Sequence, residues 1–150
     1  MSPLRMGVMG CANFAWQSMI PALIECDAVD LVAVASRTKD KAQKFSRRFH
    51  CDAIEGYETL LSRKDIEAIY MPLPTGLHEE WVIKALEARK HLLVEKSFAE
   101  NFASAKKMTD LARAKKCLVM ENFLFPHHSQ HAWVNEKIKK SELGEIHLFR

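Results

Sequence analysis

The chain has 150 residues, of which 48% are hydrophobic and 27% charged, and its net charge at pH 7 is +3. This length suits one domain with its own core, and these proportions are typical of a soluble globular protein rather than a disordered or fibrous one. The Lys and Arg residues are spread along helical patterns without interleaved aromatic residues, which argues against nucleic-acid binding. No apolar run reaches the ~18 residues that span a bilayer, so we expect no membrane association.

Short apolar runs alternate with amphipathic helical stretches along the chain, which is the pattern of βαβ units in a parallel sheet. The runs are rich in Val, Ile and Leu, as in strands that helices cover on both faces. The predicted strands are Leu4–Met9, Asp30–Ala35, Cys51–Ile54 (the least regular), Ala68–Met71, His91–Val94 and Leu118–Glu121. The predicted helices are Ala15–Glu25, Lys39–Phe49, Tyr57–Leu61 (one short turn), His78–Ala88 and Phe102–Lys115. The sequence therefore predicts an α/β fold with a doubly wound parallel sheet.

The segment after residue 121 follows a different pattern. A helix begins at Pro126 and stops at Gly144, and the alternating apolar residues Ile146, Leu148 and Phe149 indicate a new strand. We therefore divide the chain into a domain at residues 1–121 and a linking helix with the first strand of a second sheet at residues 122–150. A strand without a partner in its own sheet can pair with another chain, so we expect a homo-oligomer.

Cysteine and histidine residues, which form disulfides or bind metals, are scattered. The four cysteines have no CxxC spacing, and no signal peptide precedes the first strand, so we expect reduced thiols in a cytoplasmic protein. His127 and His131 lie one helical turn apart, but two imidazoles lack the third ligand of a catalytic zinc. We expect no metal site and interpret these histidines as a polar helix face.

The loop after the first predicted strand carries Gly10, Ala12 and Ala15 where a dinucleotide-binding loop carries three glycines. Gly10 fits the tight turn, and Ala15 is small enough for the position where helix packs on strand. Ala12 adds a methyl group where the cofactor phosphates come closest. The loop alone leaves two interpretations open, a degenerate cofactor loop or an ordinary strand-to-helix turn.

The end of the second predicted strand favours the phosphorylated cofactor. NAD-binding domains carry Asp or Glu there to bind the adenosine ribose, whereas an NADP site needs cations and hydroxyls for the 2′-phosphate. This chain has Ser36, Arg37 and Thr38, with Lys41 one helical turn later. Arg37 can make a charge-assisted bidentate contact with a phosphate. A solvated helix cap formed by Thr38 is the structural alternative, and it can coexist with NADP(H) binding.

Candidate catalytic residues follow the later strands, because ligands of open α/β sheets bind beyond the carboxyl ends of the strands. Glu95 and Lys96 are adjacent at the end of one strand. A carboxylate there can hold a ribose hydroxyl, and a lysine can donate a proton to a carbonyl oxygen. Taken alone, the pair is equally explained as a surface ion pair of little energetic value.

Four segments together, "GVMGCANFAW", "ASR", "PLPTGLH" and "VEKSFAEN", resemble in order and spacing the nucleotide-binding domain of the glucose-fructose oxidoreductase/inositol dehydrogenase family (Gfo/Idh/MocA). The resemblance covers essentially the whole chain and implies a Rossmann-type sheet. Within the family, "MENFLFPHHSQH" is most similar to the nucleotide-sugar 3-ketoreductases, which reduce a keto-sugar with NADPH. Family members continue into an α/β substrate domain, so we expect this chain to hold only its first strand.

The resemblance also implies roles for individual residues. Lys96 is expected to contact the reacting sugar oxygen, Glu95 to lie near the nicotinamide ribose and Asn122 near the nicotinamide. Two departures from the family pattern are Ala12 in the loop and Ser97 in place of a proline after the lysine. The expected cofactor-binding residues are Gly10, Ala12, Asn13, Phe14, Ser36, Arg37, Thr38, Lys41, Pro72, Pro74, Thr75, His78, Glu95 and Asn122.

Two functions follow from these expectations. The first is an NADP-dependent oxidoreductase that transfers hydride at a ketone or secondary alcohol of a sugar, nucleotide sugar or cyclitol, with Lys96 as the catalytic residue. The second is a truncated, non-catalytic module that binds NADP(H) or only associates with itself, which Ala12, Ser97 and the missing substrate domain favour. The identity of the sugar and the direction of the reaction cannot be predicted from these residues.

Overall fold

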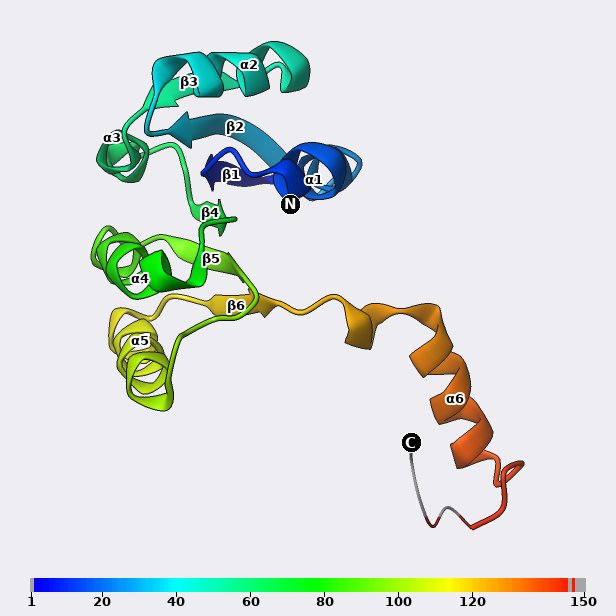
Figure 1. Ribbon diagram of the computed structural model, residues 1–150. Coiled ribbons are helices and arrows are strands. Elements are labelled where there is room, and N and C mark those ends of the chain that lie inside the picture. The colour runs from blue at the N-terminus through cyan, green and yellow to red at the C-terminus, as the bar shows by residue number, and fades with distance from the viewer. Residues whose placement is uncertain (1, 146, 148–150) are drawn as a thin grey trace.

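The computed structural model of the chain describes residues 2–145 and 147 and contains one six-stranded parallel sheet. The strand order is β3-β2-β1-β4-β5-β6, so the direction of winding reverses between β1 and β4 (Figure 1). The strands are β1 (Leu4–Met9), β2 (Val29–Ser36), β3 (Asp52–Glu55), β4 (Ala68–Met71), β5 (His91–Glu95) and β6 (Val119–Asn122). This arrangement confirms the predicted Rossmann-type doubly wound sheet, in which ligands bind where the order reverses.

Helices cover the sheet in two layers, each with its own core. Figure 1 shows α3, α4 and α5 on one side of the sheet and α1 on the other. Ile20 of α1 and Phe45 of α2 share one buried cluster with Val34 of β2, whereas Leu60 of α3 and Met108 of α5 belong to the other. The helices are α1 (Ile20–Ile24), α2 (Lys39–Phe49), α3 (Tyr57–Ser62), α4 (His78–Glu87) and α5 (Phe102–Lys115). Right-handed crossovers place successive helices in this way.

The helix after β1 differs from the predicted regular helix at Ala15–Glu25. A π-helical turn occupies Ala15–Met19, and α1 follows it. Pro21 explains the difference, because proline has no N–H to donate and its ring crowds the carbonyl four residues earlier. The wide turn moves the chain past this position, and the N–H of Ile20 donates to the Ala15 carbonyl.

Strand ends lie slightly beyond the predicted ones at three positions that carry function. Ser36, Glu95 and Asn122 are each the last residue of a strand rather than the first residue after it. The β5–β6 register pairs Glu95 with Asn122, so these two side chains meet at the carboxyl edge of the sheet. Parallel pairing therefore gathers these residues at one edge.

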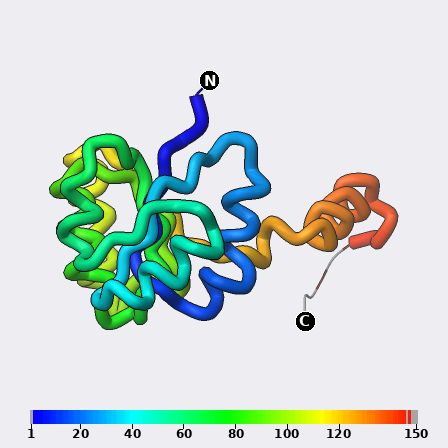
Figure 2. The backbone as a smooth tube through the Cα atoms, turned by 90° about the horizontal axis from the view of Figure 1, so that it is seen from above, coloured from blue at the N-terminus to red at the C-terminus, as the bar shows by residue number. Residues whose placement is uncertain are grey.

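The tail projects away from the sheet (Figures 1 and 2). A 3-10 turn at Phe125–His127 precedes α6 (Ser129–Lys139), which contains no buried residue. The predicted continuous helix from Pro126 to Gly144 is wrong at both ends. His128 is extended and its side chain caps α6 by accepting from the N–H of Gln130. Left-handed residues at Ser141 and Gly144 turn the chain after α6. The strand predicted at Ile146, Leu148 and Phe149 lies outside the described residues.

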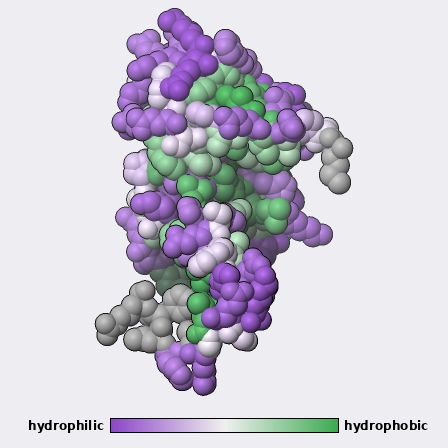
Figure 3. Space-filling view, turned by 90° about the vertical axis from the view of Figure 1, so that its right-hand side faces the viewer, coloured by the Kyte–Doolittle hydropathy of each residue, from purple (hydrophilic) through white to green (hydrophobic). Residues whose placement is uncertain are grey.

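One side of the sheet keeps apolar surface. Figure 3 views the molecule from the right-hand side of Figure 1 and shows apolar residues at the surface across its middle. Leu118 and Met120, at β6, have 75% and 51% of their surface exposed. Among the described residues, no helix is long and apolar enough to cross a membrane.

Candidate functional site

Two adjoining pockets open at the carboxyl edge of the sheet, and they share Ala12, Pro72 and Leu73. We name them after one residue of each. The Arg37 pocket has a volume of about 360 Å³ and is lined by Gly10, Cys11, Ala12, Ser36, Arg37, Thr38, Lys41, Tyr57, Pro72, Leu73 and Pro74. The Lys96 pocket has a volume of about 660 Å³ and is lined by Ala12, Phe14, Pro72, Leu73, Glu95, Lys96, Asn122, Phe123, Leu124 and Phe125.

Gly10 sets the floor of the Arg37 pocket. Its φ of +118° is strained for any other residue, and an added Cβ would lie 2.9 Å from Leu73 Cδ2. Its N–H donates to the Ala35 carbonyl at 2.9 Å, which ties the loop to β2. The first helical turn begins at once, because the Trp16 N–H donates to the Ala12 carbonyl at 3.1 Å. Free N–H groups at this helix start can bind a phosphate.

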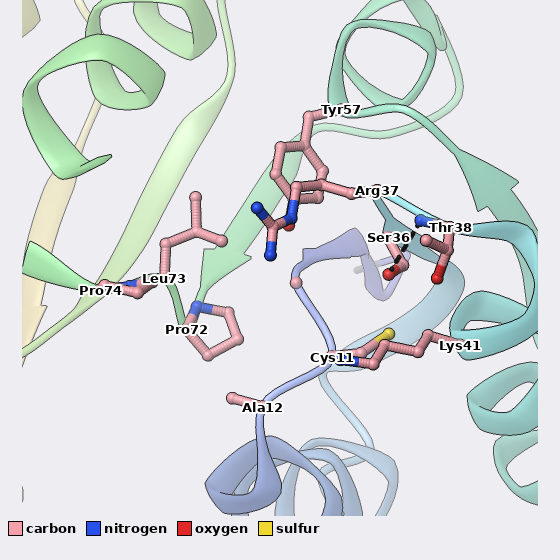
Figure 4. Close-up of a pocket in the computed structure, with 11 residues that line it drawn as sticks. Cys11, Ala12, Ser36, Arg37, Thr38, Lys41, Tyr57, Pro72, Leu73 and Pro74 are labelled. Carbon is pink, nitrogen blue, oxygen red and sulfur yellow. Dashed lines mark hydrogen bonds between the residues drawn. The ribbon is translucent and has the colours of Figure 1, made fainter. Parts of the chain in front are cut away.

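Cations and hydroxyls surround the rest of this pocket. Arg37 leaves the end of β2 and points across the opening toward Leu73, with Lys41 on the far side of Cys11 (Figure 4). The buried Ser36 hydroxyl accepts from the Thr38 N–H at 3.4 Å. The Thr38 side chain makes no cap hydrogen bond to α2, unlike the structural alternative considered above. Among the described residues, the lining contains no carboxylate.

Cys11 and Tyr57 line the Arg37 pocket although the sequence analysis did not place them there. Burial raises the pKa of the Cys11 thiol to about 11. Burial also raises the pKa of Tyr57, and the nearby positive charge of Arg37 acts in the opposite direction. Two signals pointed to these residues: Cys11 lies between two predicted loop residues, and Tyr57 comes two residues after β3. Leu73, between two predicted prolines, was missed in the same way.

A hydrogen-bond network fixes the carboxylate beside Lys96. The Tyr70 hydroxyl donates to Glu95 Oε1 at 2.8 Å, and Asn122 Nδ2 donates to the same oxygen at 2.5 Å. Burial, and then the hydrogen bond to Glu95, raises the pKa of Tyr70, so its hydroxyl stays a donor. Asn122 Nδ2 also lies 3.4 Å from Met19 Sδ. This network orients the Glu95 carboxylate at the edge of the Lys96 pocket.

Lys96 is the first residue after β5 and is exposed in its pocket. In the part of the chain that the structure describes, Glu95 and Lys96 form no ion pair, in contrast to the surface-pair interpretation. The Lys96–Ser97 peptide bond is cis. The ammonium group is therefore available to a ligand in the Lys96 pocket.

Three predicted residues lie outside both linings. Asn13 is exposed in the first helical turn, and Thr75 starts a 3-10 turn (Thr75–Leu77) before α4. His78 is fully buried, and its ring nitrogens face backbone carbonyls, so the expectation that it lines the cleft does not match its position.

Three apolar residues after β6 form the outer wall of the Lys96 pocket. Phe123, Leu124 and Phe125 are about half exposed, at 49%, 51% and 56%. The two phenyl rings meet edge to face at 4.8 Å. The sequence analysis assigned them to the linking segment, although the rule that ligands bind beyond strand ends applies to them as well.

The fold and the pockets define a nucleotide-binding domain of an oxidoreductase, and the family comparison agrees. Residues 4–123 match the model of an oxidoreductase family described as having an NAD-binding Rossmann fold. The chain belongs to this family, which is the Gfo/Idh/MocA family inferred from the sequence motifs.

Individual relatives narrow the comparison. The chain is 47% identical over 147 residues to a dTDP-3,4-didehydro-2,6-dideoxy-alpha-D-glucose 3-reductase of Saccharopolyspora spinosa, covering 98% of this chain and 44% of the relative. The solved structure of KijD10, a 3-ketoreductase from Actinomadura kijaniata in complex with NADP, is 43% identical with a TM-score of 0.91, covering 96% of this chain and 46% of that one. A myo-inositol 2-dehydrogenase from Lactobacillus plantarum, 18% identical with a TM-score of 0.86 over 96% of this chain and 43% of that one, shares the fold. The chain thus spans less than half the length of these relatives.

Proposed function

We propose that this chain is the cofactor-binding part of an NADP-dependent oxidoreductase that reduces a keto group of a nucleotide sugar. The observation that carries the proposal is the pairing of the two pockets. One offers Arg37 and Lys41 without a carboxylate in its lining, and the other offers Lys96 beside an oriented Glu95. The shared wall at Ala12, Pro72 and Leu73 allows one extended ligand to reach both.

The residues of the chain fit NADP(H) at each of its charged groups. The backbone at Gly10 leaves room for a close approach of the pyrophosphate, because this position has no side chain. Arg37 and Lys41, with the hydroxyls of Ser36 and Thr38, would hold the 2′-phosphate. The methyl group of Ala12 lines both pockets and narrows the passage between them.

Bound NADPH would supply a hydride to the carbonyl carbon and leave as NADP⁺. The Lys96 ammonium would donate a hydrogen bond to the carbonyl oxygen and then its proton, so that the ketone becomes a secondary alcohol. Glu95 would accept a hydrogen bond from a ribose hydroxyl on the side that Tyr70 and Asn122 leave free. The nucleotide-sugar substrate class is supported by the S. spinosa and A. kijaniata reductases.

We also propose a domain boundary at residues 121–122, with residues 122–150 leading into a substrate domain. The end of β6 at Asn122 and the absence of buried residues in α6 support it. Phe123 and Phe125 would then belong to a wall shared by the two domains.

Titration calorimetry of this chain with NADPH and NADH tests the cofactor proposal. We expect NADPH to bind more tightly, and Arg37→Ala to weaken NADPH by about 10- to 100-fold while changing NADH little, because a hydrogen bond to a charged group contributes about 1.5–3 kcal/mol. Arg47→Ala is the matched control, since Arg47 is exposed on α2 outside both pockets. Equal binding of the two cofactors, or equal losses in the two variants, would refute NADP selectivity. Binding of neither would favour a self-associating module.

A further inference from the structure

The side chain of His78 lies between the two loops that shape the Lys96 pocket. It is the first residue of α4 and is fully buried. On one side, Nε2 lies 2.8 Å from the Leu73 carbonyl oxygen, in the loop after β4. On the other side, Nδ1 lies 3.0 Å from the Ser97 carbonyl oxygen and 3.1 Å from that of Phe98, in the loop after β5.

These two loops carry the groups that the proposed reaction needs. Leu73 lines both pockets, and Ser97 directly follows Lys96. The far end of the second loop is fixed separately, because Asn101 Oδ1 accepts from the Ser104 N–H at 2.9 Å and caps α5. The Phe98 N–H donates to Glu121 Oε1 at 2.9 Å, which attaches the middle of this loop to β6. His78 is the contact that joins it to the loop after β4.

We propose that His78 is a positioning residue that sets the place of Lys96 relative to a bound cofactor. The inference rests on the proposed function, and it assigns His78 no contact with cofactor or substrate. All three atoms facing the ring are carbonyl oxygens, which only accept hydrogen bonds. A neutral imidazole carries one N–H and can donate toward one loop, so donating to both loops takes the ring with two N–H groups.

Two probes of different length separate positioning from a general structural role. Adenosine 2′,5′-bisphosphate carries the groups that the Arg37 pocket would bind, and NADPH also extends into the Lys96 pocket. We expect His78→Phe, which keeps a ring without N–H groups, to weaken NADPH by about 10-fold and the bisphosphate by less than about 3-fold. His78→Gln retains an amide donor for one loop, and we expect an intermediate loss of NADPH affinity.

Val82→Ala is the matched control for destabilisation. Val82 is fully buried on the same helix, one turn after His78, and lines neither pocket. Both variants should lower the thermal unfolding midpoint, but only His78→Phe should change the ratio of the two dissociation constants. A parallel loss for both probes in His78→Phe would overturn the positioning role.

Nitrogen-15 NMR of the imidazole ring in the ligand-free chain tests the bridge itself. We expect two protonated ring nitrogens at pH 7, each with a hydrogen-bonded proton. A single protonated nitrogen would overturn the two-sided bridge. This readout does not depend on NADPH, so wild-type protein that binds neither probe refutes the proposed function while the NMR result still decides whether His78 joins the loops.

Discussion

The Arg37 pocket and the Lys96 pocket adjoin each other but are built differently. The Arg37 pocket is bounded by the ends of β1, β2 and β4, and buried or half-buried residues such as Ser36 and Tyr57 form its walls. The Lys96 pocket has one side fixed by the Glu95 network and the other formed by Phe123–Phe125, each about half exposed. A single sheet thus completes a site for the phosphates, whereas the site of chemistry keeps apolar surface open to a further element.

The largest effect should come from breaking the floor of the Arg37 pocket with Gly10→Ala. The positive φ and the 2.9 Å approach to Leu73 Cδ2 make any side chain costly there. We expect the free energy of unfolding to fall by about 1–3 kcal/mol and NADPH affinity to fall by at least about 10-fold, measured by chemical denaturation and calorimetry.

Gly144→Ala provides the control for Gly10→Ala. Gly144 also has a positive φ, but an added Cβ there meets no atom within 4 Å. It should cost some stability in the tail and leave NADPH affinity unchanged. Equal losses of NADPH affinity in the two variants would mean that the Gly10 floor does not touch the cofactor.

The fixed side of the Lys96 pocket can be weakened with Tyr70→Phe. The hydroxyl is buried and donates to Glu95 Oε1, so its loss should cost about 1 kcal/mol of unfolding free energy. Glu95 keeps its bond from Asn122, so we expect bisphosphate affinity to be unchanged and NADPH affinity to fall modestly. Unchanged stability in urea denaturation would show that the Tyr70 bond does not hold Glu95.

The closure of the Arg37 pocket can be measured through its thiol. Because burial raises the pKa of Cys11 to about 11, only about 0.1% of it is thiolate at pH 8, and the thiolate is the nucleophile. Mass spectrometry should show iodoacetamide modifying the exposed Cys26 first. The rate at Cys11 should rise with pH toward about 11. Modification of Cys11 as fast as Cys26 at pH 8 would contradict a closed pocket.

The smallest effect should come from the opposite edge of the sheet, before β4. Arg63, and then Arg5, holds the pKa of the Asp65 carboxyl well below its usual 3.8. A lowered folded-state pKa contributes stability above pH 3.8 that is lost as the pH falls through the lower value. Asp65→Asn should therefore be slightly less stable than wild type at pH 7 and equal to it in strong acid. A change in NADPH affinity would contradict the separation of the two edges.

The sequence predicts elements well where the signal is local. All six strands of the sheet and the bounds of α2 and α5 follow from apolar spacing, and Gly10 and Arg37 follow from their positions after strands. Tertiary contacts decide the rest. His78 reads as a cleft residue in its motif, but its ring turns inward because three carbonyls from two loops face it. The Glu95–Tyr70 bond joins residues 25 positions apart, which no local pattern reveals.

The π-helical turn at Ala15–Met19 acts as a phase correction between the loop and the helix. A π-turn accommodates one residue more than the α-helix it interrupts, and each residue rotates a helix by about 100°. Without it, a helix starting at the same loop would turn Ile20 and Leu23 out of the core in which they are buried. Deleting Gln17 would thus straighten the helix and misalign it, so the spacing between loop and core is as constrained here as the residues themselves.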